Sequence, residues 1–129
     1  FHKLHKLVTQ HYSIGLVTAS PRHNLNWLQT LINLDELFEH IISGDETEKN
    51  KPHPEPYLIM MDKLSVKPEN VVIIEDSLHG IQAALASGAA VIAKTGSVPE
   101  SDLSIAHQII THLDEITHNM IEDLLQGDK

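Results

Sequence analysis

One stretch of the chain decides the fold: residues 71–77, which read VVIIEDS. The four apolar residues at 71–74 predict a strand that is buried on both faces, as in the middle of a parallel sheet. Glu75 and Asp76 follow at the end of this strand, and Asp76 or Ser77 is suited to cap the helix expected next. The stretch therefore indicates an α/β protein in which polar residues stand between a buried strand and a helix.

Strands and helices alternate outward from this stretch in both directions. Short apolar runs predict further strands at residues 14–18, 41–42, 90–93 and 109–110, and apolar residues at helical spacing predict helices around residues 1–8, 25–32, 57–64, 78–85 and 113–124. This alternation is typical of a parallel sheet covered by helices. Since 129 residues are an ordinary length for one domain, we expect a single α/β unit with about five strands.

Composition and charge exclude several classes of protein. Eighteen Asp and Glu residues against nine Lys and Arg residues give a net charge of −9 without a basic stripe, so nucleic acid is not an expected partner. The longest near-apolar stretch, residues 83–93, is interrupted by Ser87 and Gly88 and is shorter than the roughly 18 residues that span a membrane. The absence of cysteine excludes disulfides and thiolate sites, and with no visible leader segment it fits a cytoplasmic protein.

Polar residues follow three of the predicted strands. In chain order they are Thr18 with Ala19 and Ser20, then Asp45 and Lys51, then Glu75 and Asp76. Because ligands of open α/β sheets bind beyond the carboxyl ends of the strands, we expect these side chains to form one site. Each group taken alone has a plainer interpretation as a turn, a loop or a helix cap, and only the order and placement together indicate a site.

The residue types at these strand ends suit phosphoryl chemistry. Adjacent carboxylates offer oxygen ligands to Mg²⁺, which commonly binds through one or two carboxylates together with water and phosphate. A lysine supplies positive charge to phosphoryl oxygens. A threonine hydroxyl and the backbone N–H groups at a helix start can donate hydrogen bonds to them.

Three segments resemble the second, third and fourth motifs of the haloacid dehalogenase-like hydrolases. They are residues 15–20 (GLVTAS), 51–57 (KPHPEPY) and 72–84 (VIIEDSLHGIQAA), and they look most like the β-phosphoglucomutase and sugar-phosphate phosphatase branch. The resemblance covers roughly residues 1–95. It implies a Rossmann-like, three-layer parallel sheet with helices on both faces. It also implies a Mg²⁺-dependent phosphatase or phosphomutase that acts on a small phosphorylated metabolite through an aspartyl-phosphate intermediate.

The resemblance also assigns roles to individual residues. Thr18, Lys51 and Asp76 would be catalytic, with Thr18 binding a phosphoryl oxygen and Lys51 holding both the nucleophile and the phosphate. The phosphate-binding group would be Thr18, Ala19, Ser20 and Lys51. Mg²⁺ would be bound by Asp76 together with Glu75, directly or through water.

The sequence departs from the family at its catalytic centre. The family's nucleophile lies in a D-x-D motif after its first strand, and no D-x-D occurs in these 129 residues. The helical cap domain that this branch inserts after that strand is also absent. We therefore interpret residues 1–129 as a partial core domain that lacks the family's first strand and its cap, and we expect the chain alone to be inactive.

The first strand of the family lies between the strands that here end at Thr18 and Glu75. Its loss would leave two strand edges without partners, and such edges adhere to other chains. We expect these two strands either to pair with each other or to hold another chain, or a second copy, between them.

Two other interpretations remain open. The chain could be a short, non-catalytic α/β protein that binds a phosphorylated ligand or a partner chain, although its start at Phe1 rather than methionine favours a fragment. A receiver-type signalling domain also gathers carboxylates, a hydroxyl and a lysine at strand ends. It needs an acidic pair after its first strand, whereas the order here is hydroxyl, lysine, acidic pair.

Overall fold

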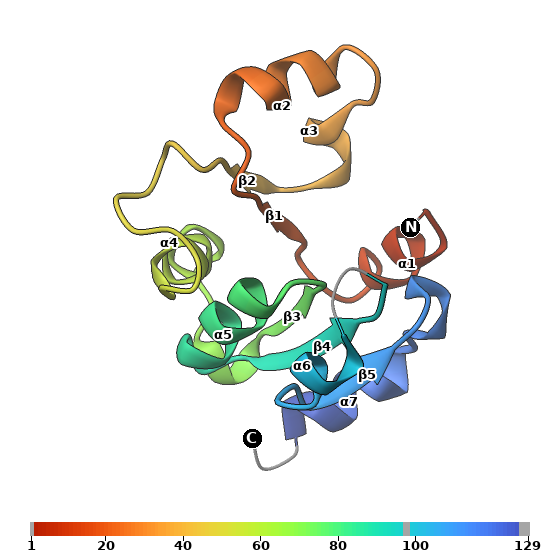
Figure 1. Cartoon of the computed structure of the whole chain (residues 1–129). Coiled ribbons are helices and arrows are strands. Elements are labelled where there is room, and N and C mark those ends of the chain that lie inside the picture. Colours follow the sequence, from red (N-terminus) through yellow and green to blue (C-terminus); the bar gives the residue numbers. More distant parts are fainter. Residues whose placement is uncertain (1, 97–98, 127–129) are drawn as a thin grey trace.

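Five short parallel strands form the centre of the protein (Figure 1). A computed structural model describes residues 2–96 and 99–126. The strands within that part are β1 (Gly15–Val17), β2 (His40–Ile42), β3 (Val72–Glu75), β4 (Ala90–Lys94) and β5 (Gln108–Ile110). They make two sheets, one of β1 and β2 and one in the order β3-β4-β5. The expected α/β alternation and the five strands are confirmed.

Helices connect the strands and cover them. They are α1 (His2–Val8), α2 (Arg22–Gln29), α3 (Leu34–Leu37), α4 (Glu55–Leu64), α5 (Leu78–Ala86), α6 (Glu100–Leu103) and α7 (His118–Gln126), with 3₁₀ turns at Pro68–Asn70 and Leu113–Glu115. The prediction of one helix over residues 113–124 is wrong at its start, because the chain makes a 3₁₀ turn there before α7. None of the helices in the described residues is long and apolar enough to cross a membrane.

The second sheet separates two apolar cores, as a three-layer structure requires. Alternate strand residues point to opposite faces. Ile73 and Val91 belong to the core that α4, α5 and α6 cover, whereas Ile92 and Ile110 belong to the core that α1 and α7 cover. Helices therefore pack on both faces of this sheet, as the sequence predicts.

Strand β3 is less buried than its four apolar residues suggest. Ile73 is buried, but 37% of Ile74 remains exposed. The prediction that both faces of this strand are buried is therefore wrong. The reason is its position, because among the described strands β3 pairs with β4 alone and lies at the edge of its sheet.

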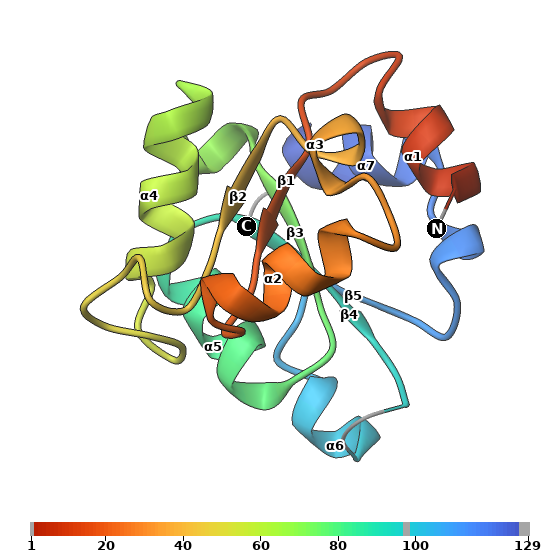
Figure 2. The same cartoon turned by 90° about the horizontal axis from the view of Figure 1, so that it is seen from above.

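Of the two alternatives expected for the strands that end near Thr18 and Glu75, direct pairing is wrong. Within the part of the chain that the structure describes, β1 is hydrogen-bonded only to β2 and β3 only to β4. Helix α4 packs on β1 and β2 and also touches α5, which packs on β3 (Figure 2). Helix packing therefore holds the two sheets side by side without strand-to-strand hydrogen bonds between them.

Helix α5 begins and ends as the sequence indicates. The Ser77 hydroxyl oxygen accepts a hydrogen bond from the backbone N–H of Gly80 at 3.0 Å, so Ser77, and not Asp76, is the N-cap. Gly88 follows the C-cap with φ +91°, a conformation that glycine adopts without a side-chain penalty. These two signals fix the helix that follows Glu75 and Asp76.

Candidate active site

Lys51 joins the carboxyl ends of the two sheets. Its ammonium donates a hydrogen bond to the Glu75 carboxylate oxygen Oε1 at 2.8 Å, at the end of β3. It donates a second, longer one to the backbone oxygen of Val17 at 3.4 Å, at the end of β1. The two side chains are only 15% and 10% exposed, so water screens this ion pair weakly. The structure thus brings Lys51 and Glu75 together, as the strand-end argument predicts.

Both carboxylate oxygens of Glu75 accept hydrogen bonds from neighbouring side chains. Besides Lys51, its Oε1 accepts a hydrogen bond from the hydroxyl of Tyr57 at 2.6 Å, and its Oε2 accepts a longer one from Ser77 Oγ at 3.3 Å. Its carboxylate also lies against Gly80, where an added Cβ would stand 1.6 Å from Oε2. Glu75 therefore serves as a fixed anion that orients its neighbours.

Tyr57 is a site residue that the sequence interpretation missed. It lies on α4 beside Met60 and Met61, which are also buried, and it is only 6% exposed. Burial first, and then the charge of Glu75, raise the pKa of its hydroxyl above the ordinary tyrosine range. A tyrosine in an apolar helix stripe needs a polar partner when buried, and this requirement was the available signal.

Thr18, Ala19 and Ser20 form a tight turn beside the end of β2. The backbone N–H of Thr18 donates to Ile42 O at 3.0 Å, and its Oγ1 accepts from the backbone N–H of Ser20 at 3.1 Å. Gly44 lies so close that an added Cβ would stand 2.0 Å from the oxygen of Ala19. The turn begins at the residue after Val17, and the carbonyl oxygen of Val17 accepts a hydrogen bond from Lys51.

Asp45 is positioned for a structural task. Its carboxylate accepts hydrogen bonds from the Ser43 hydroxyl at 2.5 Å and from the backbone N–H of Arg22 at 3.1 Å. Arg22 is the first residue of α2, and the preceding Pro21 provides no side-chain cap. Asp45, from a loop distant in the sequence, thus accepts a hydrogen bond from a backbone N–H at the N-terminus of α2. Negative charge is favourable at a helix N-terminus.

This capping carboxylate makes stability depend on pH. The hydrogen bonds from Ser43 and Arg22 lower the pKa of Asp45, so its stabilising effect is present above the unfolded value of about 3.9 and is lost as the pH falls through the lower folded value. We expect Asp45→Asn to be less stable than the wild type at pH 6, with the difference shrinking toward pH 2. Urea unfolding across this range measures it, with the exposed Asp62→Asn as control. A difference that stays constant with pH would contradict the assignment.

Asp76 and Glu75 differ in what they can offer a metal ion. Asp76 is exposed, whereas both oxygens of Glu75 accept hydrogen bonds from side chains of the protein. Among the described residues there is no group of three or more His, Asp or Glu side chains that could hold a metal. Mg²⁺ commonly binds through one or two carboxylates together with water and phosphate, and the exposed Asp76 is a carboxylate of the type that such a site uses.

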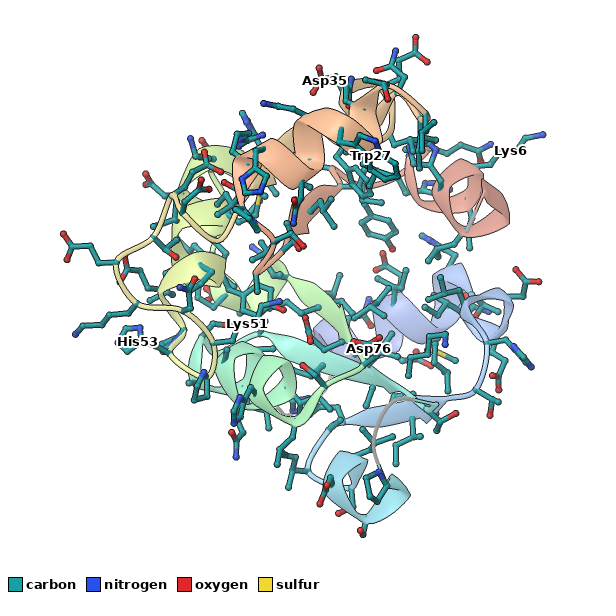
Figure 3. The ribbon with its side chains drawn as sticks, turned by 45° about the horizontal axis from the view of Figure 1, so that its top comes forward. Lys6, Trp27, Asp35, Lys51, His53 and Asp76 are labelled. Carbon is teal, nitrogen blue, oxygen red and sulfur yellow. The ribbon has the colours of Figure 1, made fainter. Side chains whose placement is uncertain are left out.

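The side-chain view places these residues relative to one another. In Figure 3, Lys51 and Asp76 both lie near the middle of the view and come from different elements, while His53 lies farther out on its loop. Lys51 precedes α4 and Asp76 follows β3. The Lys51 ammonium thus contacts Glu75, the residue before Asp76, and the carbonyl oxygen of Val17, the residue before Thr18.

Comparison with known proteins agrees with this arrangement. Residues 2–94, which include β1 to β4 and every residue of the site, match the profile of the family described as haloacid dehalogenase-like hydrolase. The chain belongs to the haloacid dehalogenase-like hydrolases. This confirms the resemblance drawn from the three sequence motifs.

Two individual proteins similar to this chain are phosphatases, and a mutase shares its fold. A phosphoglycolate phosphatase of Salmonella typhimurium is 38% identical over 76 residues, which are 59% of this chain and 30% of that protein. A phosphorylated carbohydrates phosphatase of Thermotoga maritima is 35% identical over 75 residues, 58% of this chain and 35% of that protein. The crystal structure of β-phosphoglucomutase from Clostridium difficile shares the fold, with a TM-score of 0.81 at 23% identity over 96% of this chain and 54% of that one. The chain spans about a third of the length of these two curated phosphatases.

Proposed function

We propose that this chain is the phosphate- and Mg²⁺-binding part of a phosphatase or phosphomutase that acts on a small phosphorylated metabolite. The observation that carries the proposal is the Lys51 ammonium, which lies between the ends of β1 and β3 in hydrogen bonds to Val17 O and Glu75 Oε1. A shielded cation at the carboxyl edge of parallel strands suits a phosphoryl group. The names of the phosphatase relatives support the substrate class.

Each proposed residue has a task in this site. Lys51 balances the charge of the phosphoryl oxygens and of the nucleophile. Thr18, with the backbone of Ala19 and Ser20, donates hydrogen bonds to a phosphoryl oxygen. Asp76, supported by Glu75, holds Mg²⁺, which supplies positive charge to the phosphoryl group when it is bound.

The nucleophile in this proposal comes from outside residues 1–129. The sequence contains no D-x-D, and the edges of β1 and β3 that face each other are not hydrogen-bonded to one another. We propose that a further strand, from a longer form of the protein or from another chain, fits between these edges and brings an aspartate next to Lys51. That aspartate would form the aspartyl-phosphate intermediate.

The direct test is hydrolysis of p-nitrophenyl phosphate by the purified 129-residue chain with Mg²⁺. We expect no turnover above buffer, because a positioned lysine and carboxylate without a nucleophile do not cleave the ester. The protein translated from the whole reading frame is then assayed with phosphoglycolate and a hexose phosphate. There we expect turnover that Lys51→Ala and Asp76→Ala both abolish.

Two results would contradict parts of this proposal. Mg²⁺-dependent turnover by the 129-residue chain that is lost in Asp76→Ala would show that no outside nucleophile is needed. A reading frame that begins near Phe1, together with phosphate binding and no turnover, would favour a non-catalytic phosphate-binding protein instead.

A further inference from the structure

A buried hydroxyl at the candidate site has a task that the proposed roles do not include. Tyr57 lies on α4 with its ring in the apolar core, and its hydroxyl donates to Glu75 Oε1 at 2.6 Å. The same oxygen accepts the hydrogen bond from Lys51 at 2.8 Å. Two donors from different segments therefore converge on one carboxylate oxygen.

The second contact between these residues runs through the ring. The Lys51 ammonium lies 5.1 Å from the centre of the Tyr57 ring, within the range of a cation–π interaction. Tyr57 thus restrains Lys51 twice, once through the face of its ring and once through the carboxylate that they share.

These contacts direct the donors of Lys51. An ammonium has three N–H donors, and two of them have acceptors in the described residues, Glu75 Oε1 and Val17 O. With two donors fixed, tetrahedral geometry fixes the direction of the third. A phosphoryl oxygen that meets this third donor would find it oriented in advance, which avoids an ordering cost on binding.

We propose that Tyr57 is a positioning residue for Lys51, which holds the Glu75 carboxylate and, through it, the ammonium in the orientation that binds a phosphoryl oxygen. The inference rests on the proposed function for its ligand, and on the geometry alone for its effect on Lys51. A purely structural role would need only the ring, because phenylalanine fills the same core space without a hydroxyl to desolvate. The hydrogen bond to Glu75 distinguishes the two roles.

The test follows the Lys51 ammonium by NMR in the chain labelled with ¹⁵N-lysine. The Lys51 signal is assigned by its absence in Lys51→Met. In Tyr57→Phe we expect the ammonium protons to exchange with water about tenfold faster, since loss of a hydrogen bond to a charged group has an effect of this size. Tyr12→Phe is the matched control, because Tyr12 is the other tyrosine and its hydroxyl donates to Glu122 on α7 instead.

The affinity for inorganic phosphate provides a second measurement. Titration of the same three proteins with inorganic phosphate and Mg²⁺ is expected to give about tenfold weaker binding for Tyr57→Phe and unchanged binding for Tyr12→Phe. Thermal unfolding establishes that both variants are folded. If Tyr57→Phe does not fold, the hydroxyl proton of Tyr57 is observed in the wild-type chain, where slow exchange with water supports the proposal and fast exchange overturns it.

The outcomes separate this inference from the proposed function. Unchanged exchange of the Lys51 ammonium in Tyr57→Phe overturns the positioning role, whatever the phosphate titration gives. Faster exchange in Tyr57→Phe supports it. If the wild-type chain then binds no phosphate, the proposed function fails while the effect of Tyr57 on Lys51 stands.

Discussion

Replacement of Lys51 by methionine is expected to lower the free energy of unfolding by about 3 kcal/mol, the usual cost of removing one partner from a buried ion pair. Methionine keeps the length and the apolar stem of the side chain but removes the charge. The Glu75 carboxylate, with a side chain only 10% exposed, would then keep the Tyr57 and Ser77 hydroxyls but lose its cation. Urea unfolding followed by circular dichroism measures the change.

The matched control for this variant is Lys49→Met, two residues earlier in the same loop. Lys49 is exposed, and we expect a change below about 1 kcal/mol, as for other surface charges. In the double variant Lys51→Met with Glu75→Gln, the buried charge is gone and part of the lost stability should return. Equal effects of Lys51→Met and Lys49→Met would show that the pair does not stabilise the fold.

Gly80→Ala is the second substitution with a large expected effect. Alanine usually stabilises a helix interior by about 1 kcal/mol relative to glycine. Here the new Cβ would stand 1.6 Å from Glu75 Oε2 and 2.2 Å from its Cδ, so the carboxylate must move. We expect a net destabilisation of about 2 kcal/mol, the range of overpacked cores, and loss of phosphate binding because Lys51 follows Glu75.

A double variant tests whether the contact between the new Cβ and Glu75 causes this destabilisation. Gly80→Ala is measured alone and together with Glu75→Ala, which removes the carboxylate that the new methyl group meets. In that background the added cost of Gly80→Ala should disappear, and the helix preference for alanine should make it slightly stabilising. Gln82→Ala, at an exposed position of the same helix, serves as the control and should be nearly neutral. A stabilising Gly80→Ala in the wild-type background would contradict the close approach.

The alternation of strands and helices along the chain was predictable because it depends on local sequence pattern. Four apolar residues followed by Glu75 and Asp76 indicated β3, and Ser77 and Gly88 marked the ends of α5, since capping and φ preferences act within a few residues. The meeting of Lys51 with Glu75 followed from the rule that parallel strands end at one edge of a sheet. The family match over residues 2–94 confirms the motif-based assignment.

Properties that depend on partners distant in the sequence were not predictable in this way. The exposure of Ile74 depends on which strands flank β3, and a run of apolar residues does not indicate which strands those are. Apolar residues at helical spacing indicate that the Tyr57 ring is buried, but the spacing does not reveal that its hydroxyl donates to Glu75. Chain order predicts Asp45 at the site, whereas its carboxylate accepts hydrogen bonds from Ser43 and Arg22. These partners depend on how the loops pack, which the sequence pattern does not indicate.

The division into two sheets has a consequence for the motions of the protein. Sheet β1-β2 carries the Thr18 turn and sheet β3-β4-β5 carries Glu75 and Asp76, and no strand ladder couples them within the described residues. Relative sliding of the two sheets is therefore resisted by helix packing and by the Lys51 contacts, not by a continuous hydrogen-bond network. A ligand bound by Thr18 and Lys51 together would connect the two sheets and restrict their relative motion. Occupancy of the site and rigidity of the whole chain would then rise together.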